Sequence, residues 1–324
     1  MLGYDTSYKL ADVHELEDYL AKLHNLFDTD ALLQAPTNED DVVDYYQQSF
    51  NGYRHVHSSF GAVHMGFTED GAFNERDYYG QAKHIAAHID TLQQAAQPIT
   101  AVLELASGQG VNSNYLAERY PDVSFTGIDL TPKHLKVAEG FAAKRANLNF
   151  VKGNFQDMPF AEASFDVVFE VESICYATNM AKAVAEIYRV LRPGGVAVLF
   201  DGFRLTSAKS VSAALKQANE LVEAAMTIDA FWELTDWLEL VRAQGFTVLQ
   251  LEDYFEKVLP TLARLQTLAR FFIDTPMLRV VLPKVLPPKL LQNAIAGLLM
   301  PFTIQAGTQA YYYIVLQKPQ LDDA

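Results

Sequence analysis

The stretch that decides the fold is TAVLELASGQGVNSNYLAERY, residues 100–120. Its apolar run Ala101–Leu105 predicts a strand, although one acid, Glu104, lies inside it. The run breaks at Ser107-Gly108-Gln109-Gly110, and Val111–Arg119 then has the spacing of a helix. Glycines let a backbone approach a ligand closely, and open α/β sheets bind ligands at the carboxyl ends of their strands. The stretch therefore indicates a cofactor loop.

From residue 99 onward, strand-like runs alternate with helix-like runs. This alternation predicts an α/β fold with a Rossmann-like, seven-stranded, mostly parallel sheet and helices on both faces. The expected strands are Ala101–Leu105, Ser124–Asp129, Leu148–Lys152, Phe165–Glu170, Val196–Phe200, Thr247–Leu251 and Tyr311–Leu316. The expected helices include Val111–Arg119, Pro132–Ala146, Ala181–Leu191 and Thr235–Gln244, and Pro193-Gly194-Gly195 turns the chain into the fifth strand.

The chain divides into four predicted segments. Residues 1–98 form an N-terminal helical cap or lid, in which 10–35 has helical spacing and 42–84 has no clean period. Residues 99–254 form the core, and 255–306 form a helical lid inserted before the last strand. Residues 307–324 supply that final strand and a tail. An insertion of this length beside a site is usually functional.

Charge and composition exclude several classes of protein. The net charge is −15, so a phosphate backbone would be repelled and nucleic acid is not an expected partner. The one cysteine, Cys175, cannot form an internal disulfide or a cysteine-rich metal site, which suggests an inert thiol in a reducing compartment. The N-terminus lacks the pattern of a signal peptide, and the apolar run Ala294–Phe302 has only nine residues, too few for a membrane span. We expect a cytoplasmic protein that contacts a membrane at most peripherally.

The glycine turn does not match a dinucleotide fingerprint, because Ser113 stands where a third glycine is needed. Asp129 ends the second strand, 21 residues after Gly108, where an acid can accept both hydroxyls of a ribose. The alternative is that Asp129 caps the helix predicted to begin at Pro132, but Thr131 is better placed as the N-cap of that helix. Glu104 must be paired, and a ligand with a positive charge would account for it.

The motifs LELASGQG, FTGIDLTP, GNFQDMPF, SFDVVFE and LRPGG, in this order, resemble the class I S-adenosylmethionine-dependent methyltransferases. The resemblance covers residues 99–253 and the last strand. It implies S-adenosylmethionine as cofactor and S-adenosylhomocysteine as product. The family usually has glycine where this chain has Ala106, and alanine is expected to be tolerated there with a negative φ.

The resemblance also implies roles for individual residues. The backbone around Ala106, Ser107, Gly108 and Gly110 would line the methionine part, while Glu104 shapes the turn or meets the amino group through water. Asp129 would bind the ribose, Leu130 would pack on adenine, and Asn154 would meet its amino group beside Phe155. Glu170, at the end of the fourth strand, is a further expected cofactor contact. Asp157 is a second candidate for the role of Asn154.

A second resemblance concerns the methyl acceptor. FEVESICYATN resembles a segment of sterol C-methyltransferases, tocopherol methyltransferases and some natural-product O-methyltransferases, with Glu172 and Tyr176 on the matching positions. DYYQQSFNGYRHVHSSFGAVHMGF and the C-terminal region resemble the same group. The resemblance implies that Glu172, His64 and Tyr176 are catalytic. It also implies that Tyr45, Tyr46 and Tyr53 contact the substrate.

Several alternatives stay open from the sequence. The three cap tyrosines could be core aromatics. His55 and His57 could bind a metal ion, but no third ligand is evident, so no metal is expected. The acceptor would be a sterol, isoprenoid, quinone or polyketide-like molecule, with carbon slightly favoured over oxygen. Other possibilities are a non-catalytic protein that binds the cofactor or a lipid, or a methyltransferase for a polar metabolite. The oligomeric state is open and includes a homodimer.

The insertion 255–306 is basic within an acidic chain. It carries Lys257, Arg264, Arg270, Arg279, Lys284 and Lys289 against Glu256 and Asp274, an excess of 6 − 2 = +4. Basic, apolar helices can rest on membrane surfaces. The alternative is a lid with a solvated basic edge. Either reading favours a hydrophobic acceptor.

Overall fold

The computed structural model describes residues 8–35, 37–69, 72–94, 98–205 and 211–320. Its centre is a seven-stranded sheet in the order β3-β2-β1-β4-β5-β7-β6, in which β7 is antiparallel to both neighbours. The strands are β1 Ala101–Leu105, β2 Ser124–Asp129, β3 Leu148–Lys152, β4 Phe165–Val171, β5 Leu191–Arg204, β6 Thr247–Asp253 and β7 Gln309–Gln317. The predicted fold class is confirmed. Some predicted boundaries were wrong: β5 runs from Leu191, before the Pro-Gly-Gly turn, to Arg204, and the helix that begins at Pro132 ends at Ala142 rather than Ala146.

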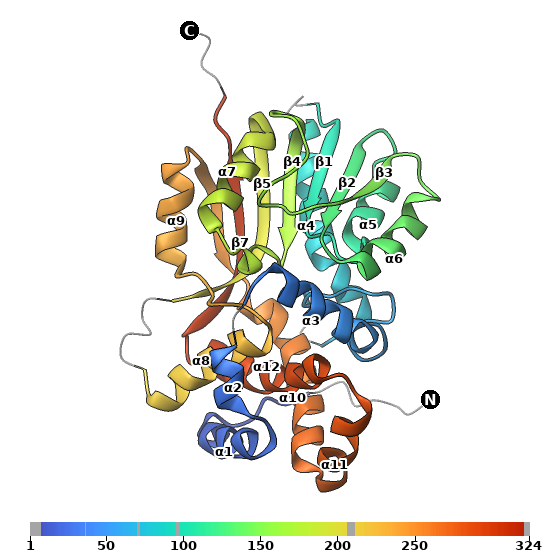
Figure 1. The fold of residues 1–324 in the computed structure, drawn as a ribbon. Coiled ribbons are helices and arrows are strands. Elements are labelled where there is room, and N and C mark those ends of the chain that lie inside the picture. Colours follow the sequence, from blue (N-terminus) through green and yellow to red (C-terminus); the bar gives the residue numbers. More distant parts are fainter. Residues whose placement is uncertain (1–7, 36, 70–71, 95–97, 206–210, 321–324) are drawn as a thin grey trace.

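Helices cover both faces of the sheet (Figure 1). One face packs on α4 Gly80–Gln94 and α5 Val111–Arg119, and the other packs on α7 Met180–Val190 and α9 Leu234–Ala243. Successive strand residues point to opposite faces, so in β1 Val102 belongs to the first core and Leu103 to the second. Helix α6 Pro132–Ala142 lies beside β2 and β3. The predicted cap segment 1–98 therefore includes one helix, α4, that packs on the sheet.

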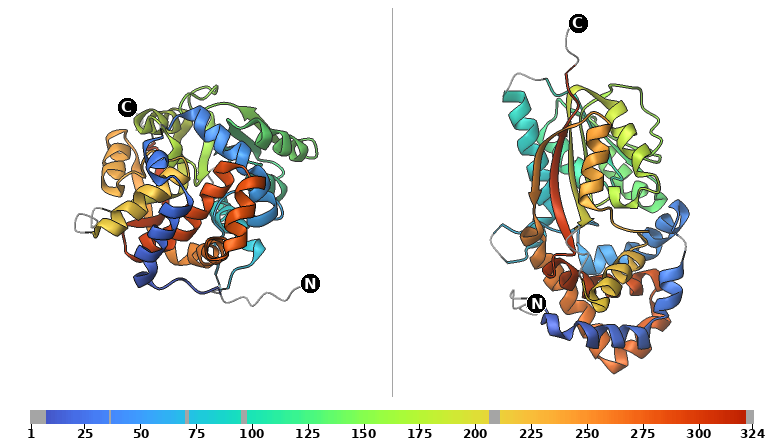
Figure 2. Two further views of the ribbon diagram at one scale, coloured as in Figure 1. Left: turned by 60° about the horizontal axis from the view of Figure 1, so that its bottom comes forward. Right: turned by 90° about the vertical axis from the view of Figure 1, so that its left-hand side faces the viewer.

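A second helical layer lies at one end of the sheet (Figures 1 and 2). It contains α1 Leu16–Leu26, α2 Thr29–Gln34, α3 Glu39–Gly52, α8 Ala213–Ala225, α10 Phe255–Asp274, α11 Pro276–Val285 and α12 Pro288–Gln305. Apolar side chains of α1, α8, α10 and α12 form one core, so the N-terminal segment and the late insertion fold together. Among the described residues, no helix combines the length and hydropathy that a bilayer crossing needs.

The turn after β1 differs from the expectation at Ala106. We expected a negative φ, but φ is +42°, and Gly108 and Gly110 follow with φ of +53° and +79°. The expectation was wrong because the chain must leave β1 and enter α5 within five residues, which it does through left-handed backbone. A Cβ on Gly110 would lie 2.5 Å from the ring of Phe150, so glycine is required there. Ala106 accepts strain of about 1–2 kcal/mol instead.

We expect Ala106→Gly to leave the free energy of unfolding unchanged or to raise it by up to about 1 kcal/mol. Relief of left-handed strain offsets the freedom that glycine adds to the unfolded chain. Urea unfolding measures the change. Ala87→Gly is the control, because Ala87 is exposed inside α4 and its replacement should lose about 1 kcal/mol. Equal losses in both variants would contradict the strain at Ala106.

Candidate active site

A crevice lies where β1, β2 and β3 end, and it holds a cavity of about 70 Å³. Its lining contains six of the residues predicted to bind the cofactor: Ala106, Gly108, Asp129, Leu130, Asn154 and Phe155. Four others, Glu104, Ser107, Gly110 and Glu170, lie outside this lining. Asp157, the alternative to Asn154, is also outside it and is highly exposed. The structure thus brings the ends of three strands together around one small crevice.

Glu104 lies behind the glycine turn and is satisfied by α5. Its carboxylate accepts hydrogen bonds from the Ser113 backbone N–H (3.1 Å), the Ser113 hydroxyl (2.5 Å) and the Asn112 amide (3.2 Å). Burial still raises the pKa of Glu104 to about 7. The acid is therefore paired without a charged ligand, and it fixes the start of α5 against β1.

Asp129 holds the rim of the crevice. Its carboxylate accepts from the backbone N–H groups of Gly108 (2.8 Å) and Thr131 (2.7 Å), and His134 Nδ1 lies 3.7 Å away. Thr131 is the N-cap residue of α6, as expected, but its side chain makes no capping hydrogen bond. Asp129 therefore ties the glycine turn to the start of α6 while its side chain lines the crevice.

Glu170 has a different environment from the one expected. Its carboxylate accepts from Ser173 and Ile174 on one oxygen and from the Phe200 backbone N–H on the other. Burial, with the neighbouring carboxyl of Asp201, raises the pKa of Glu170 well above its ordinary value. Because Glu170 lines neither cavity, its contacts hold the loop after β4.

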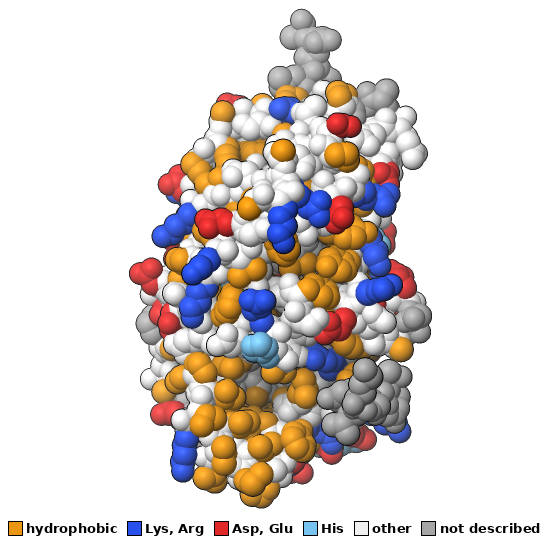
Figure 3. Space-filling model, turned by 90° about the vertical axis from the view of Figure 1, so that its right-hand side faces the viewer, with side chains coloured by type: hydrophobic (Ala, Val, Ile, Leu, Met, Phe, Trp, Pro, Cys, Tyr) orange, Lys and Arg blue, Asp and Glu red, His pale blue; other side chains and the backbone are white. Residues whose placement is uncertain are grey.

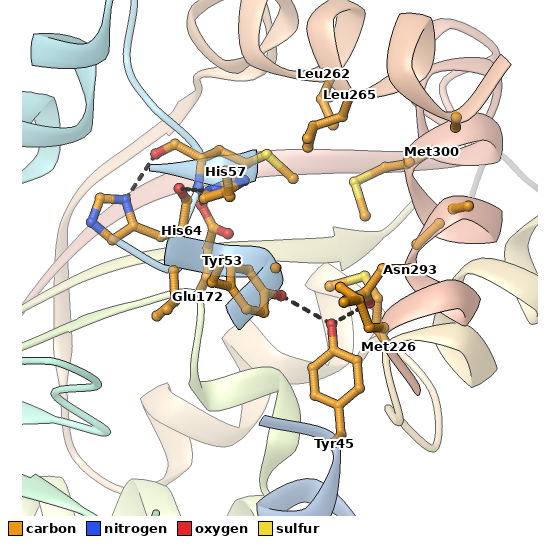
Figure 4. A pocket seen from close by; sticks show the side chains of 18 of the residues that line it. Tyr45, Tyr53, His57, His64, Glu172, Met226, Leu262, Leu265, Asn293 and Met300 are labelled. Atoms are coloured by element: carbon orange, nitrogen blue, oxygen red, sulfur yellow. Dashed lines mark hydrogen bonds between the residues drawn. The ribbon is translucent and has the colours of Figure 1, made fainter. Parts of the chain in front are cut away.

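A second, larger cavity of about 470 Å³ lies between the sheet and the helical layer. Its wall is mostly apolar and comes from α3, α10 and α12 and from the ends of β5 and β7. Figure 4 shows aliphatic and methionine side chains such as Leu262, Leu265 and Met300 on one side of the cavity, with Glu172 and Tyr53 on the other. Cavities of this size and polarity bind apolar small molecules.

Among the described residues, four line both cavities: Tyr46, Val63, Glu172 and Tyr176. They form the partition between the crevice and the apolar cavity. The rings of Tyr46 and Tyr176 meet edge to face at 5.7 Å, and the ring of Tyr46 stacks on Tyr53 at 6.0 Å. Two aromatic rings and one carboxyl group therefore stand between the two spaces.

Glu172 is the ionisable member of the partition. It follows β4 with a φ of +55°, a strained value for this residue type. Its Oε1 atom accepts both the Met65 backbone N–H (2.7 Å) and the Tyr311 hydroxyl (2.9 Å). No described residue donates to Oε2. Burial raises the pKa of Glu172 to about 8, although both hydrogen bonds act to lower it.

The other two predicted catalytic residues are less free to exchange a proton. The Nδ1 atom of His64 is 2.9 Å from the carbonyl oxygen of Met65, and its Nε2 atom is 3.4 Å from the amide nitrogen of Asn112. Both ring nitrogens are therefore engaged, and burial lowers the pKa of His64 to about 4. Burial also raises the pKa of Tyr176 well above its ordinary value. Of the three, Glu172 is best suited to accept or donate a proton.

The tyrosines predicted to contact the substrate all line the larger cavity. Tyr45 donates to Asn293 of α12 at 2.6 Å, and its hydroxyl lies 3.0 Å from that of Tyr53 (Figure 4). Tyr46 lies at the partition. The three side chains are therefore part of a packed wall and are also exposed to the cavity. The two interpretations left open from the sequence, core aromatics and substrate contacts, are thus compatible.

Sequence reasoning missed Glu39, Gln156 and Tyr311. Glu39 begins α3 and accepts from the side-chain amides of Asn154 (2.5 Å) and Gln156 (3.2 Å), so α3 closes over the crevice. The only local signal was the capping box at Asn38 and Asp41 that starts this helix. Tyr311 had no signal, because its partner Glu172 is 139 residues away.

Several observations test whether the crevice fits a cofactor. The Nε2 atom of His134, which lines the crevice, is buried without a partner among the described residues. A Cβ built on Gly108 would meet only a methyl group of Val63, at 3.1 Å, so the turn leaves space beside its backbone. An unpartnered ring nitrogen and an open turn fit a polar ligand at this position. No group of three metal-ligating side chains occurs among the described residues.

Comparison with known proteins agrees with this geometry. Residues 103–199 match the family described as "Methyltransferase domain". The phthiotriol/phenolphthiotriol dimycocerosates methyltransferase 1 of Mycobacterium ulcerans is 35% identical over 130 residues, which cover 39% of this chain and 44% of that protein. The sterol 24-C-methyltransferase erg6 of Schizosaccharomyces pombe is 25% identical over 253 residues, covering 75% and 65% of the two chains. The matches thus span less than half of the first relative and less than two thirds of the second.

A solved structure shares the architecture. The geranyl diphosphate C-methyltransferase of Streptomyces coelicolor, in complex with Mg²⁺, geranyl diphosphate and S-adenosyl-L-homocysteine, superposes with a TM-score of 0.59 at 14% identity. The match covers 88% of this chain and 100% of that one. Together with the domain match, it confirms the resemblance to the class I methyltransferases that was seen in the sequence.

The raised pKa of Glu172 has a consequence for stability. Its folded-state pKa is about 8 against an ordinary value of 4.5, so between these pH values the folded chain keeps a proton that the unfolded chain releases. The free energy of unfolding should therefore fall as pH rises through this window. We expect Glu172→Gln to reduce this fall by roughly 1–3 kcal/mol between pH 5 and pH 8, measured by urea unfolding. The exposed Glu118→Gln is the control, and parallel pH profiles for all three proteins would contradict the assignment.

Proposed function

We propose that this chain, which carries a methyltransferase domain of the class I fold, transfers a methyl group from S-adenosylmethionine to a hydrophobic small molecule. The observation that supports this most strongly is the partition. The crevice beside Asp129 and the apolar cavity share Tyr46, Val63, Glu172 and Tyr176, so ligands in the two spaces would meet there. The named relatives act on lipids and sterols, and the geranyl diphosphate enzyme acts on an isoprenoid.

The cofactor supplies a methyl group already activated by a sulfonium centre. The chain has to bind it, align the acceptor, exclude water and manage one proton. Asp129 is placed to bind a ribose, Leu130 and Phe155 offer apolar surface for a base, and Asn154 offers an amide. Glu39 of α3 covers these groups and keeps water out.

We assign the proton to Glu172. Its Oε1 is held by two donors, whereas no described residue donates to Oε2. A positive charge beside a carboxyl group lowers its pKa, so a cationic ligand or acceptor would leave Glu172 ionised and able to accept a proton. Aromatic rings stabilise a cation as well. The pairing of Tyr46 and Tyr176 with Glu172 thus favours transfer to an alkene carbon, with hydroxyl oxygen as the alternative.

Peripheral contact with a membrane through residues 255–306 would bring the chain to an acceptor dissolved in lipid, but the proposed methyl transfer does not depend on it. The structure refines the basic residues that could take part. Arg270 donates to the Tyr19 hydroxyl at 2.7 Å and lies 3.9 Å from Glu15, so it serves the packing of α10 on α1. Arg279 and Lys284 on α11 remain exposed.

The cofactor is tested by calorimetric titration of the purified protein with S-adenosylhomocysteine. We expect Asp129→Ala to weaken binding by roughly 10- to 100-fold, as loss of hydrogen bonds to a charged group does. Asp157→Ala is the matched control, an exposed acid in the neighbouring loop, and should bind like the wild type. If the wild type binds S-adenosylhomocysteine, a radiolabelled methyl-transfer screen over lipid extracts is the next experiment. No binding by the wild type would overturn the proposal.

The acceptor cavity is tested with the apolar fluorescent probe N-phenyl-1-naphthylamine. Gly297 of α12 lines the cavity, and a Cβ there would lie 3.6 Å or more from its neighbours. We expect Gly297→Leu to fill space and weaken probe binding by about tenfold or more while affinity for S-adenosylhomocysteine is kept. Gly140→Leu, on the open surface of α6, should change neither. Unchanged probe binding in Gly297→Leu would place the apolar ligand elsewhere.

A further inference from the structure

The outer side of α10 and α11 is apolar. Of the ten large hydrophobic side chains that are exposed among the described residues, seven lie here or at the adjoining turn: Val56, Leu268, Phe271, Met277, Val280, Val281 and Val285. Helix α11 buries none of its residues. Figure 3 shows apolar side chains gathered around a hollow at the lower end of one face of the molecule. Contiguous apolar surface of this kind marks an interaction site. We call these seven residues the apolar patch.

The apolar patch is continuous with the wall of the larger cavity. Val56 and Leu268 are exposed and also line the cavity, so they form part of its rim. Leu282 of α11 and Leu286 just after it line the cavity from the inner side of the same helix whose outer side chains are exposed. The apolar patch and the wall of the cavity therefore share residues at the rim.

Positively charged side chains lie beside the apolar patch. Arg279 and Lys284 on α11, and Arg54 beside the rim, are exposed, and none lies within 4.0 Å of a carboxylate in the part of the chain that the structure describes. The nearby acid Asp274 is already paired with Lys22 at 2.7 Å. In a chain of net charge −15, this face thus keeps free positive charge.

We propose that the apolar patch docks on the surface of a bilayer containing anionic lipids, and that the rim of the cavity then opens into the acyl region. Helix α11 fits this role because it combines exposed apolar residues with unpaired cations, the pattern of helices that lie in a membrane interface. The acceptor enters from the lipid and passes between α11 and the 53–57 turn. The docking itself does not require the proposed methyl transfer, but the role of the rim as an entrance for acceptor rests on it.

A second copy of the chain is the competing occupant of this face. Self-association here would cover the rim of the cavity and close the path to its interior. A two-fold contact centred on α11 would also bring Arg279 and Lys284 near their own copies, and like charges repel. Both arguments favour a lipid surface.

The docking is tested by co-sedimentation of the full chain with vesicles of phosphatidylcholine alone or with phosphatidylglycerol. We expect binding to the anionic vesicles, and a loss of about tenfold or more in the triple variant Met277→Asn, Val280→Asn, Val285→Asn. The control is Val13→Asn with Leu249→Asn, two apolar residues on other elements that are 51% and 52% exposed. Arg279→Gln with Lys284→Gln should remove the preference for anionic lipid, while Lys136→Gln with Lys144→Gln should not.

The depth of the contact is tested with tryptophan substitutions and vesicles of brominated phosphatidylcholine and phosphatidylglycerol. We expect the added fluorescence of Val280→Trp to be quenched by bromine on the acyl chains and that of Val13→Trp to be unaffected. Titration with S-adenosylhomocysteine checks that each variant keeps its fold and its cofactor site. A wild-type chain that does not bind vesicles, equal losses in patch and control variants, or a concentration-dependent dimer broken by the patch variant would each overturn the docking. These outcomes would not affect the proposed methyl transfer. Failure of the wild type to bind S-adenosylhomocysteine would overturn the proposed methyl transfer but would not affect the docking.

Discussion

The site depends on one constraint, which is that carboxylates buried at the ends of the strands must find hydrogen-bond donors. Glu104, Asp129, Glu170 and Glu172 lie within one residue of the carboxyl ends of β1, β2 and β4, and Asp201 lies three residues before the end of β5. Asp201, for example, accepts from the backbone of Cys175 at 3.0 Å and of Gly202 at 2.6 Å. Each carboxylate accepts hydrogen bonds from N–H groups of the segment that follows or faces it. These hydrogen bonds fix the conformation of a loop. Burial raises the pKa values of four of these carboxyl groups, those of Glu104, Glu170, Glu172 and Asp201. The site is therefore surrounded by carboxyl groups that hold their protons more tightly than usual.

The sequence predicted the sheet well because its signals are local. Every expected strand is present, since a run of five or six apolar and β-branched residues bounded by turn residues needs no information from elsewhere. The same is true of the crevice, because the ends of parallel strands meet at one edge. The φ of Ala106 could not be predicted, since it depends on how tightly β1 and α5 must be joined. Glu170 was predicted to contact the cofactor, but its side chain turns toward the loop that follows it.

The helical layer was harder to predict for a physical reason. Helix α3 buries only Tyr45, Ser49 and Gly52, of which one alone is large and apolar, so its sequence has no clean apolar period. Helix α8 was not expected at all, although it forms one core with α1 and α12. The partition itself joins residues from α3, the 58–68 loop and the segment after β4, which lie far apart in the sequence. Such a junction can be seen only in three dimensions.

The single thiol of the chain lies in the wall of the larger cavity. Cys175 is buried, and desolvation together with the carboxyl group of Asp201 raises its pKa well above the ordinary value. A thiol in this state reacts with an alkylating reagent only when the cavity admits water and the reagent. Since the chain has no other cysteine, the rate of its alkylation measures how often the cavity opens. Cys175 is therefore a built-in probe of the opening of the larger cavity, and it can be used without knowing the acceptor.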